Sequence, residues 1–594
     1  MTEHRCDVLV IGAGAAGLRA AIAAHEAAPS LDVLVLTKGE VGRSGATAWA
    51  CSDRMAFHAT LPYTAPGGPD NWRRHAEDIY RIGGYVSDGD LAGILARESA
   101  QAFEYLDRLG VPWVKREGRA EQFVTDGSEF ARACYTGPYT ARDIEQALLA
   151  RVRQTPVRAL ENQQAVDLLV GRDGCAGAVG LDQRTGEPWR IPARAVVLAT
   201  GGAGEAYAVH VYPAGMAGDG YAMAYRAGAE LVNMEFIQIG LSSVATQLAC
   251  SGSVMRAVPR FSDGQGREFL ARRLGTSPEA VHNLVFAKGS KWPASVEEQT
   301  TRLDIAVARE LGARERVFLD FSRDPEGFDL ARLEEKHRER FEAEAGPRRD
   351  PAQDSTPLGR LRQINPQVVE WLKERGVDLE RGHGIEIAPA VQHFQGGVKI
   401  GEWGETAVPG LHACGECAGG QHGANRPGGN ALLDTQVFGR RAGEAAARHA
   451  VETPAAGAVQ RTDTLPAFEA GGAASSEART RLRLGMSGHA AVIRTAAGLS
   501  DLLAMIADIR ARGIAVDRRG PSHAFETREL LDVAEMVVRA AAMRTESRGP
   551  HLYFTDPAGD PAPRDDGKWR KYLVIARREG EMRLEARTPQ PLPT

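Results

Sequence analysis

The segment CDVLVIGAGAAGLRAAIAAHEAA (residues 6–28) constrains the fold more than any other part of the chain. An apolar run is followed by a turn that contains Gly12, Gly14 and Gly17, and then by an alanine-rich stretch. This order predicts a buried strand, a glycine turn and a helix, and LDVLVLT (residues 31–37) predicts a second buried strand. Such a βαβ unit opens a parallel sheet, and its glycines allow a dinucleotide pyrophosphate to approach the helix N-terminus.

The end of the second strand departs from an ordinary NAD site. Thr37 and Lys38 stand where an Asp or Glu normally binds the ribose, so a different dinucleotide is favoured. The loop GRSGATAWA (residues 42–50), which follows directly, is small and rich in hydroxyl groups. A loop of this kind is suited to lie along an isoalloxazine ring and to hydrogen-bond its polar edge.

Further strands that end in glycine recur at RAVVLATGG (residues 194–202) and VPGLHACG (residues 408–415). Their wide separation predicts an α/β, Rossmann-like nucleotide-binding domain in two parts, and 594 residues are too many for one core. We expect its first part at 1–245, an α+β insertion at 246–365 and its second part at 366–455. Helical periodicity in residues 456–594 predicts a C-terminal helical domain followed by a tail.

Charge, hydropathy and cysteine usage narrow the class of protein. A net charge of −5 gives no electrostatic case for nucleic acid as a partner. We expect a cytoplasmic protein that is not embedded in a membrane, because neither a long apolar run nor a signal-like N-terminus is present. Seven scattered cysteines indicate reduced thiols. The cysteines of CGEC (residues 414–417) have two interpretations: a redox pair or two of the ligands of a zinc site, or two small buried residues in a tight turn. We favour the turn and predict no metal site.

Taken in order, the motifs resemble the flavoprotein family of succinate dehydrogenase, fumarate reductase, L-aspartate oxidase and adenylylsulfate reductase. The resemblance spans nearly the whole chain and rests on GAGAAG, TKGEVGRSGATAWA, ACYTGPYTARDIEQALL, VVLATGG, AGDGYAMAYRAGAELVNMEFIQ, VPGLHACGECAGGQHGANRPGGNALLD and TESRGPH. It implies a soluble FAD-dependent oxidoreductase. It also implies that the insertion is a capping domain that covers the substrate.

The resemblance assigns the cofactor contacts position by position. The residues expected to contact FAD are Gly12, Gly14, Ala16, Gly17, Thr37, Lys38, Ser44, Gly45, Ala46, Thr47, Thr200, Gly201, Asp219, Glu416, Asn430, Ala431, Leu432 and Leu433. Gly45 stands where membrane-complex members carry a histidine bonded to the flavin. The resemblance therefore implies non-covalent FAD, which favours a reductase or an oxidase over a succinate dehydrogenase.

On the substrate side, the resemblance places Arg426 of HGANRPGGN as the clamp for a carboxylate. The planar guanidinium fork of arginine suits this role, although an arginine in such a loop could also tie backbone carbonyls together. The family's substrate-binding histidine aligns with Gln392, while His393 comes one residue late. A shift by one residue turns a strand side chain to the other face, and a local bulge would restore it.

Other positions depart from the dicarboxylate-binding members of the family. Gly240, Gly252 and Ser253 replace a histidine, a threonine and a glutamate, so most of the grip on a second carboxylate is missing. Fumarate and succinate are therefore disfavoured as substrates. The expected substrate is a small molecule that carries one carboxylate and, at its other end, a group other than the second carboxylate of fumarate or succinate. Candidates are an amino acid, a conjugate or a larger metabolite.

The family's acid pathway is also incomplete. Arg256 matches one arginine of that pathway, and the proton-transfer arginine is either Arg302, with one inserted residue, or is lost at Leu303. This pattern favours a dehydrogenase or oxidase of a carboxylate-bearing metabolite, with O2 or a redox partner as electron acceptor. The alternatives are a fumarate-reductase-like enoate reductase, a subunit docked to an iron–sulfur partner and a flavin-binding protein without its own chemistry. A homo-oligomer is also compatible with the sequence.

Overall fold

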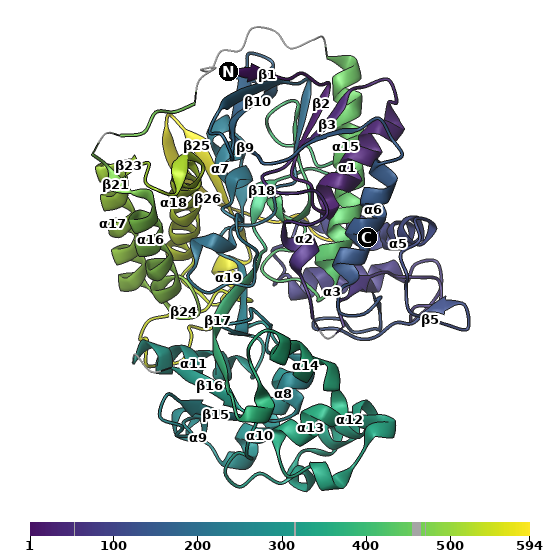
Figure 1. Cartoon of the computed structure of the whole chain (residues 1–594), viewed down its shortest axis with the longest axis vertical. Coiled ribbons are helices and arrows are strands. Elements are labelled where there is room, and N and C mark those ends of the chain that lie inside the picture. Colours follow the sequence, from purple (N-terminus) through teal and green to yellow (C-terminus); the bar gives the residue numbers. More distant parts are fainter. Residues whose placement is uncertain (53, 314–315, 454–464, 470, 594) are drawn as a thin grey trace.

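The structure is a computed structural model that describes residues 1–594 except 53, 314–315, 454–464, 470 and 594. Figure 1 shows three regions: a body that contains most of the strands, a helical bundle along one side of it, and a lobe beneath it. We call this lobe, residues 252–381, the inserted lobe, since the chain enters it from the body and returns to the body.

A five-stranded sheet with parallel pairing forms the centre of the body, in the order β19-β12-β2-β3-β8. Its strands are β2 (Val8–Ile11), β3 (Val33–Leu36), β8 (Arg158–Leu160), β12 (Ala195–Leu198) and β19 (Leu411–Ala413). The apolar runs VLVI, VLVL and AVVL are buried along their whole length, as expected for a parallel sheet covered on both faces. The predicted fold class and the βαβ unit at the N-terminus are confirmed.

Helix α1 (Ala15–Ala27) packs along the long helix α15 (Asn430–Glu452), as Figure 1 shows. Small residues permit this close approach: a Cβ at Gly443 would lie 2.1 Å from the carbonyl oxygen of Ala20. The packing of α1 on α15 thus joins segments from the two ends of the nucleotide-binding region.

The remaining helices of this region are α2 (Ala46–Trp49), α3 (Trp72–Ile82), α4 (Gly89–Arg97), α5 (Ser99–Arg108), α6 (Thr140–Val152) and α7 (Asp219–Ala227).

Two further sheets complete the body. The first, in the order β1-β11-β10-β9, contains Thr2–Glu3, Pro188–Pro192, Gly174–Asp182 and Gln163–Gly171. The second, in the order β20-β18-β13-β25-β26, contains Ala418–Gly419, Gly397–Lys399, Leu231–Val232, Tyr572–Arg578 and Glu581–Arg587. Short strand pairs are β4 (Phe57–His58) with β7 (Ala133–Cys134), β5 (Lys115–Arg116) with β6 (Arg119–Ala120), β21 (Ala473–Ala474) with β23 (Ile514–Ala515), and β22 (Arg494–Thr495) with β24 (Tyr553–Phe554).

Two antiparallel strands, β14 (Ile237–Ser243) and β17 (Ile385–Phe394), connect the body to the inserted lobe (Figure 1). They continue into β16 (Val317–Asp320) and β15 (Arg260–Asp263). The helices of the lobe are α8 (Gly252–Arg256), α9 (Leu270–Leu274), α10 (Pro278–Lys288), α11 (Thr301–Gly312), α12 (Glu335–Ala345), α13 (Pro357–Ile364) and α14 (Pro366–Glu374). They enclose a hydrophobic cluster of their own.

That cluster includes Val369, Leu372 and Leu379, which lie beyond the expected end of the insertion at residue 365. The C-terminal helices α16 (Ser475–His489), α17 (Ala496–Arg512) and α18 (Gly520–Met543) instead share one cluster with the body. Residues 246–365 as a capping domain, and the other domain boundaries, stay predictions.

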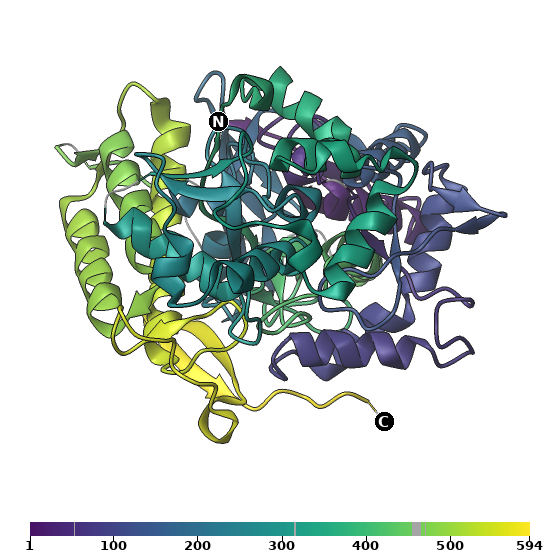
Figure 2. The same cartoon turned by 90° about the horizontal axis from the view of Figure 1, so that it is seen from below.

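The C-terminal tail returns across the body after β26 and the short helix α19 (Asp566–Trp569). Figure 2 shows it running from the yellow hairpin towards the purple helices, and the amide of Gly89 donates to the carbonyl oxygen of Gln590. No helix within the described residues is both long and apolar enough to cross a membrane.

Candidate active site

A glycine turn between β2 and α1 forms a cradle that admits no side chain. Gly12 has φ +114°, and a Cβ there would lie 2.2 Å from the carbonyl oxygen of Ala199; at Gly17 the Cβ would lie 1.9 Å from the carbonyl oxygen of Gly12. The amide of Ala15 donates to Oγ1 of Thr47 (3.2 Å), so the loop at residues 42–50 lies against this helix N-terminus. These features fit a dinucleotide pyrophosphate.

Lys38 and Asp219, both expected to contact FAD, are paired with each other. Lys38 Nζ lies 2.6 Å from Oδ2 of Asp219 and 2.9 Å from Oε1 of Glu526 on α18. Burial lowers the pKa of Lys38, but the two carboxylates more than offset it and the pKa is raised overall. The C-terminal bundle is thereby tied by a charged contact to the dinucleotide side of the body.

Glu416 lies at the end of β19, and its carboxylate accepts hydrogen bonds from Tyr212 Oη and from the amide of Phe394 (2.9 Å). Burial raises the pKa of Glu416 to about 7, although these hydrogen bonds and the nearby Arg426 lower it. Thr200, another expected FAD contact, lies 3.3 Å by its Oγ1 from Sγ of Cys417. Two expected contacts that follow different strands, Thr200 after β12 and Glu416 after β19, are therefore close together.

The CGEC segment forms a short turn (η6, Gly415–Cys417) in which Cys414 and Cys417 are buried and free. Burial raises the pKa of Cys417 to about 11, so its thiol is protonated at neutral pH. Across the described ranges, no group of three or more His, Cys, Asp or Glu side chains is placed to hold a metal ion. The geometry favours the buried-turn interpretation over a metal or thiolate site.

Asn430, the first residue of α15, is held by two histidines that sequence reasoning missed. Its Oδ1 lies 2.7 Å from Nδ1 of His58 and 3.0 Å from Nε2 of His75. Because Oδ1 only accepts, both ring nitrogens donate, and Nδ2 of Asn430 is left buried without a partner among the described residues. Ala431, Leu432 and Leu433 follow in the same helix turn. This unpartnered amide donor would suit a hydrogen-bond acceptor of FAD.

Arg426 is flanked by His422 and His393, which brings the expected carboxylate clamp and the expected histidine together. The rings of His393 and His422 are 6.3 Å apart, and Arg426 depresses the pKa of both, after burial. Burial lowers the pKa of Arg426 itself to about 10. Arg426 therefore carries the positive charge of the site at neutral pH, and both histidines are neutral.

Several polar atoms around Arg426 are unsatisfied. In the part of the chain that the structure describes, Nε of Arg426 and both ring nitrogens of His422 are buried without hydrogen-bond partners. Buried donors seldom remain unpaired, so this cluster is suited to receive an anionic group. The side-chain Nε2 of Gln395 donates to Nδ1 of His393 (3.1 Å), which leaves the proton of that ring on its own Nε2.

A bulge in β17 decides which residue of the Gln392–His393 pair faces the site. Gln238 of β14 lies opposite His393, whereas the next residue, Ile239, lies opposite Val391. Gln392 is therefore the extra residue of a β-bulge, as the sequence allowed. The bulge turns His393 towards Arg426 and not away from it.

Gly240 lies under the indole of Trp292 from the inserted lobe. A Cβ at Gly240 would be 2.6 Å from Cε2 of that ring, so no larger residue fits without moving the tryptophan. Gly252 starts α8, and Oγ of Ser253 accepts a hydrogen bond from Nδ2 of Asn365 (3.1 Å). The positions of the missing second-carboxylate grip are thus filled by structural contacts.

Comparison with known proteins identifies the family. Residues 7–432 match the FAD binding domain model, and residues 479–591 match the fumarate reductase flavoprotein C-terminal model. The chain belongs to the succinate dehydrogenase and fumarate reductase flavoprotein family. Its members are FAD-dependent oxidoreductases, and so is this chain.

Relatives within this family extend over nearly the full chain. A fumarate reductase (CoM/CoB) polypeptide of Methanothermobacter marburgensis is 29% identical, over 97% of this chain and 98% of its own length. L-aspartate oxidase of Streptomyces coelicolor is 30% identical, over 96% and 91%. Among solved structures, the Mycobacterium smegmatis Sdh1 complex with UQ1 has a TM-score of 0.79 at 26% identity, and covers 100% of this chain and 95% of the other.

In this member of the family, the two arginines expected to move protons are engaged inside the inserted lobe. Arg302 is exposed on α11 and donates to the carbonyl oxygen of Leu274 (2.8 Å). Arg256 pairs with Glu344 (2.7 Å) and donates to the carbonyl oxygen of Gly289 (2.9 Å). Leu303, the alternative position, is buried. Both guanidinium groups are thus engaged by partners within the inserted lobe, and the catalytic roles expected for Arg256 and Arg302 stay predictions.

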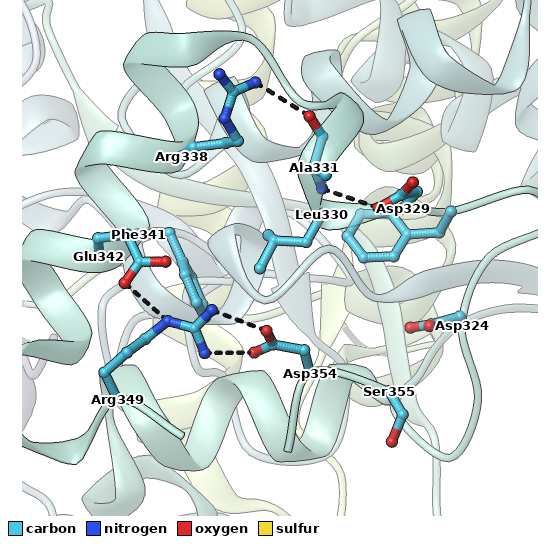
Figure 3. Close-up of a pocket in the computed structure, with 11 residues that line it drawn as sticks. Asp324, Asp329, Leu330, Ala331, Arg338, Phe341, Glu342, Arg349, Asp354 and Ser355 are labelled. Atoms are coloured by element: carbon cyan, nitrogen blue, oxygen red, sulfur yellow. Dashed lines mark hydrogen bonds and ion pairs between the residues drawn. The ribbon is translucent and has the colours of Figure 1, made fainter. Parts of the chain in front are cut away.

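A cavity of about 480 Å³ in the inserted lobe shares no residue with this site. Figure 3 shows that its arginines are already committed: Arg349 forms a forked ion pair with Asp354 and bonds Glu342, and Arg338 binds the carbonyl oxygen of Ala331. Among the described residues that line it, the cavity offers no free charged donor comparable to Arg426.

Proposed function

We propose that the chain is an FAD-dependent dehydrogenase or oxidase of a carboxylate-bearing metabolite. Arg426 carries the proposal, because it is a half-buried cation whose Nε has no partner among the described residues and which lies beside His393 and His422, so it offers an anchor for one carboxylate. Glu416 and Asn430, on either side of Arg426 in sequence, are the residues that would hold the flavin next to that anchor.

The proposed direction follows from the acid–base groups. Reduction of a C=C bond needs an acid that protonates carbon, whereas oxidation at a C–N bond releases a proton from the amine, which solvent can accept. The engagement of Arg302 and Arg256 within the inserted lobe supports oxidation. When bound, FAD supplies a two-electron acceptor for the hydride. Loss of hydride from carbon and of one proton from nitrogen leaves a C=N bond, and the two electrons then reduce O2 or a redox partner.

We propose that the flavin is bound without a covalent link. Gly45 has φ +90°, and among the described residues nothing lies within 4 Å of the position its Cβ would take. No nucleophilic side chain is therefore presented at this point of the loop. On precipitation of the purified protein with trichloroacetic acid, the yellow colour should appear in the supernatant. Colour that stays in the pellet would show a covalent flavin.

Anaerobic reduction of the flavin tests the proposed function. We expect at least one carboxylated amine or related acid to bleach the flavin absorbance of the purified protein, and air to restore it if O2 is the acceptor. The informative alternative is a flavin that no such acid bleaches but that, once chemically reduced, is reoxidised by an enoate such as fumarate. That result would identify an enoate reductase, and the proposed direction would be wrong.

A further inference from the structure

We propose that the substrate of this site carries one carboxylate and an apolar group at its far end, and that Trp292 forms the wall against that group. The proposal rests on the proposed function, since it concerns the same site. It assigns to the inserted lobe a role in choosing the substrate as well as in covering it.

Two successive cross-strand pairs on one face of the β14–β17 ribbon differ in polarity; we call them the first row and the second row. Cross-strand partners in an antiparallel pair share a face, and residues two apart along a strand share it too. Gln238 and His393 form the first row, and Nε2 of Gln238 donates to Oδ1 of Asn425 (2.6 Å) in the HGANRPGGN loop. Gly240 and its partner Ala390 form the next row on the same face. From the first row to the second, this face therefore changes from amide and imidazole side chains to a glycine and an alanine.

Trp292 covers that second row and is held there by hydrogen bonds from its backbone amide and its indole nitrogen. Its ring lies on Gly240, its Nε1 donates to the carbonyl oxygen of Leu241 (2.8 Å), and its amide donates to Oδ2 of Asp126 (3.2 Å). Its only side-chain donor is thus used by the backbone of β14. Trp292 is 4% exposed, and its ring has no free polar atom, so apolar contact is all that it can offer to a ligand.

A second carboxylate is poorly matched to this arrangement. Its negative charge would meet the negative face of an indole and would lose water without gaining a donor. A methyl, alkyl or aromatic group is stabilised by the same contact, because it loses no hydrogen bonds to water when it is buried against the ring. The cationic Arg426, beside the neutral His422, then binds the single carboxylate.

Pairs of acids that differ only at the far end provide the test. Fumarate is compared with crotonate and cinnamate, and L-aspartate with L-2-aminobutyrate and L-phenylalanine, using the purified full-length flavoprotein under anaerobic conditions. Binding is read from the perturbation of the flavin spectrum, and turnover from bleaching. We expect the apolar-ended acid of each series to bind about tenfold more tightly, or better, than its dicarboxylate partner. Tighter binding of the dicarboxylates would overturn the proposal.

The two readouts separate this inference from the proposed function. Apolar-ended acids that bind preferentially without bleaching the flavin would support the inference and count against the oxidative function. Bleaching by dicarboxylates alone would do the reverse. If no acid of either kind perturbs the spectrum, both are wrong.

A substitution at Trp292 tests whether this residue causes the preference for apolar-ended acids. In Trp292→Ala, we expect the preference for apolar-ended acids over dicarboxylates to fall by about tenfold. The matched control is Trp371→Ala on α14, whose ring stacks beneath Arg375 on the lobe and which should keep the wild-type preference. An unchanged preference in a folded Trp292→Ala protein would refute the role of this residue; if that variant does not fold, the wild-type series still decides the proposal.

Discussion

Replacement of Arg426 by alanine is expected to lower kcat/KM for the carboxylate substrate by about a hundredfold or more while the protein keeps its FAD. Loss of one partner of a buried, hydrogen-bonded charge pair costs about 2–5 kcal/mol, and here the partner left unpaired is the substrate carboxylate. Arg426 is not among the residues expected to hold the cofactor, so flavin content should not change. Steady-state kinetics and the ratio of flavin to protein absorbance measure the two effects.

Two further variants show whether the fork or only the charge matters. Arg426→Lys keeps a cation but loses the bidentate geometry, so its kcat/KM should lie between those of wild type and Arg426→Ala. Arg448→Ala is the matched control, because this arginine of α15 stacks on Trp403 and not on the site. Unchanged kinetics in Arg426→Ala would remove Arg426 from substrate binding.

Replacement of Gly17 by alanine is expected to abolish retention of FAD during purification. The added Cβ would lie 1.9 Å from the carbonyl oxygen of Gly12, a backbone atom that cannot rotate away. The turn must therefore shift at the point where the pyrophosphate approaches, and overpacking of this kind costs about 1–3 kcal/mol before any loss of ligand contacts. Flavin content after gel filtration and the Tm with and without added FAD measure the result.

Gly488 on α16 provides the control for this substitution. It lies within a helix, and the described residues place nothing within 4 Å of its would-be Cβ. Gly488→Ala should leave flavin content unchanged and stabilise the fold by about 0.5–1 kcal/mol, because glycine is unfavourable inside a helix. Equal loss of flavin in both variants would argue against a specific cradle at Gly17.

The sequence predicts the dinucleotide turn well, because the glycine spacing between a strand and a helix is a local pattern, and the main constraint on Gly17 comes from Gly12, five residues away. It also predicts the loop around Arg426, where small residues flank a single cation. It leaves the choice between Gln392 and His393 open, since a bulge depends on the pairing of β17 with β14. Register of this kind is a property of two strands together.

Contacts between residues that are far apart in the sequence could not be predicted from the sequence alone. Neither His58 nor His75 lies in a motif that indicates a function, and only the fold brings both of them to Asn430. Trp292 likewise carries no motif, and its role depends on the lobe placing it over Gly240. The resemblance leaves the proton-transfer arginine open between Arg302 and a loss at Leu303, and the sequence does not show that Arg302 is exposed on α11.

The pairing of β12 with β19 has a consequence for the order in which this protein is made. Residues 199–410 must be synthesised between these two strands, which takes on the order of ten seconds or more at ribosomal rates. During that time one edge of the central sheet is unpaired, and closing so long a loop is slow. The inserted lobe, with its own cluster, is free to fold meanwhile. Glu416 and Asn430 are made only after β19, so we expect flavin binding to be a late event that follows completion of the sheet.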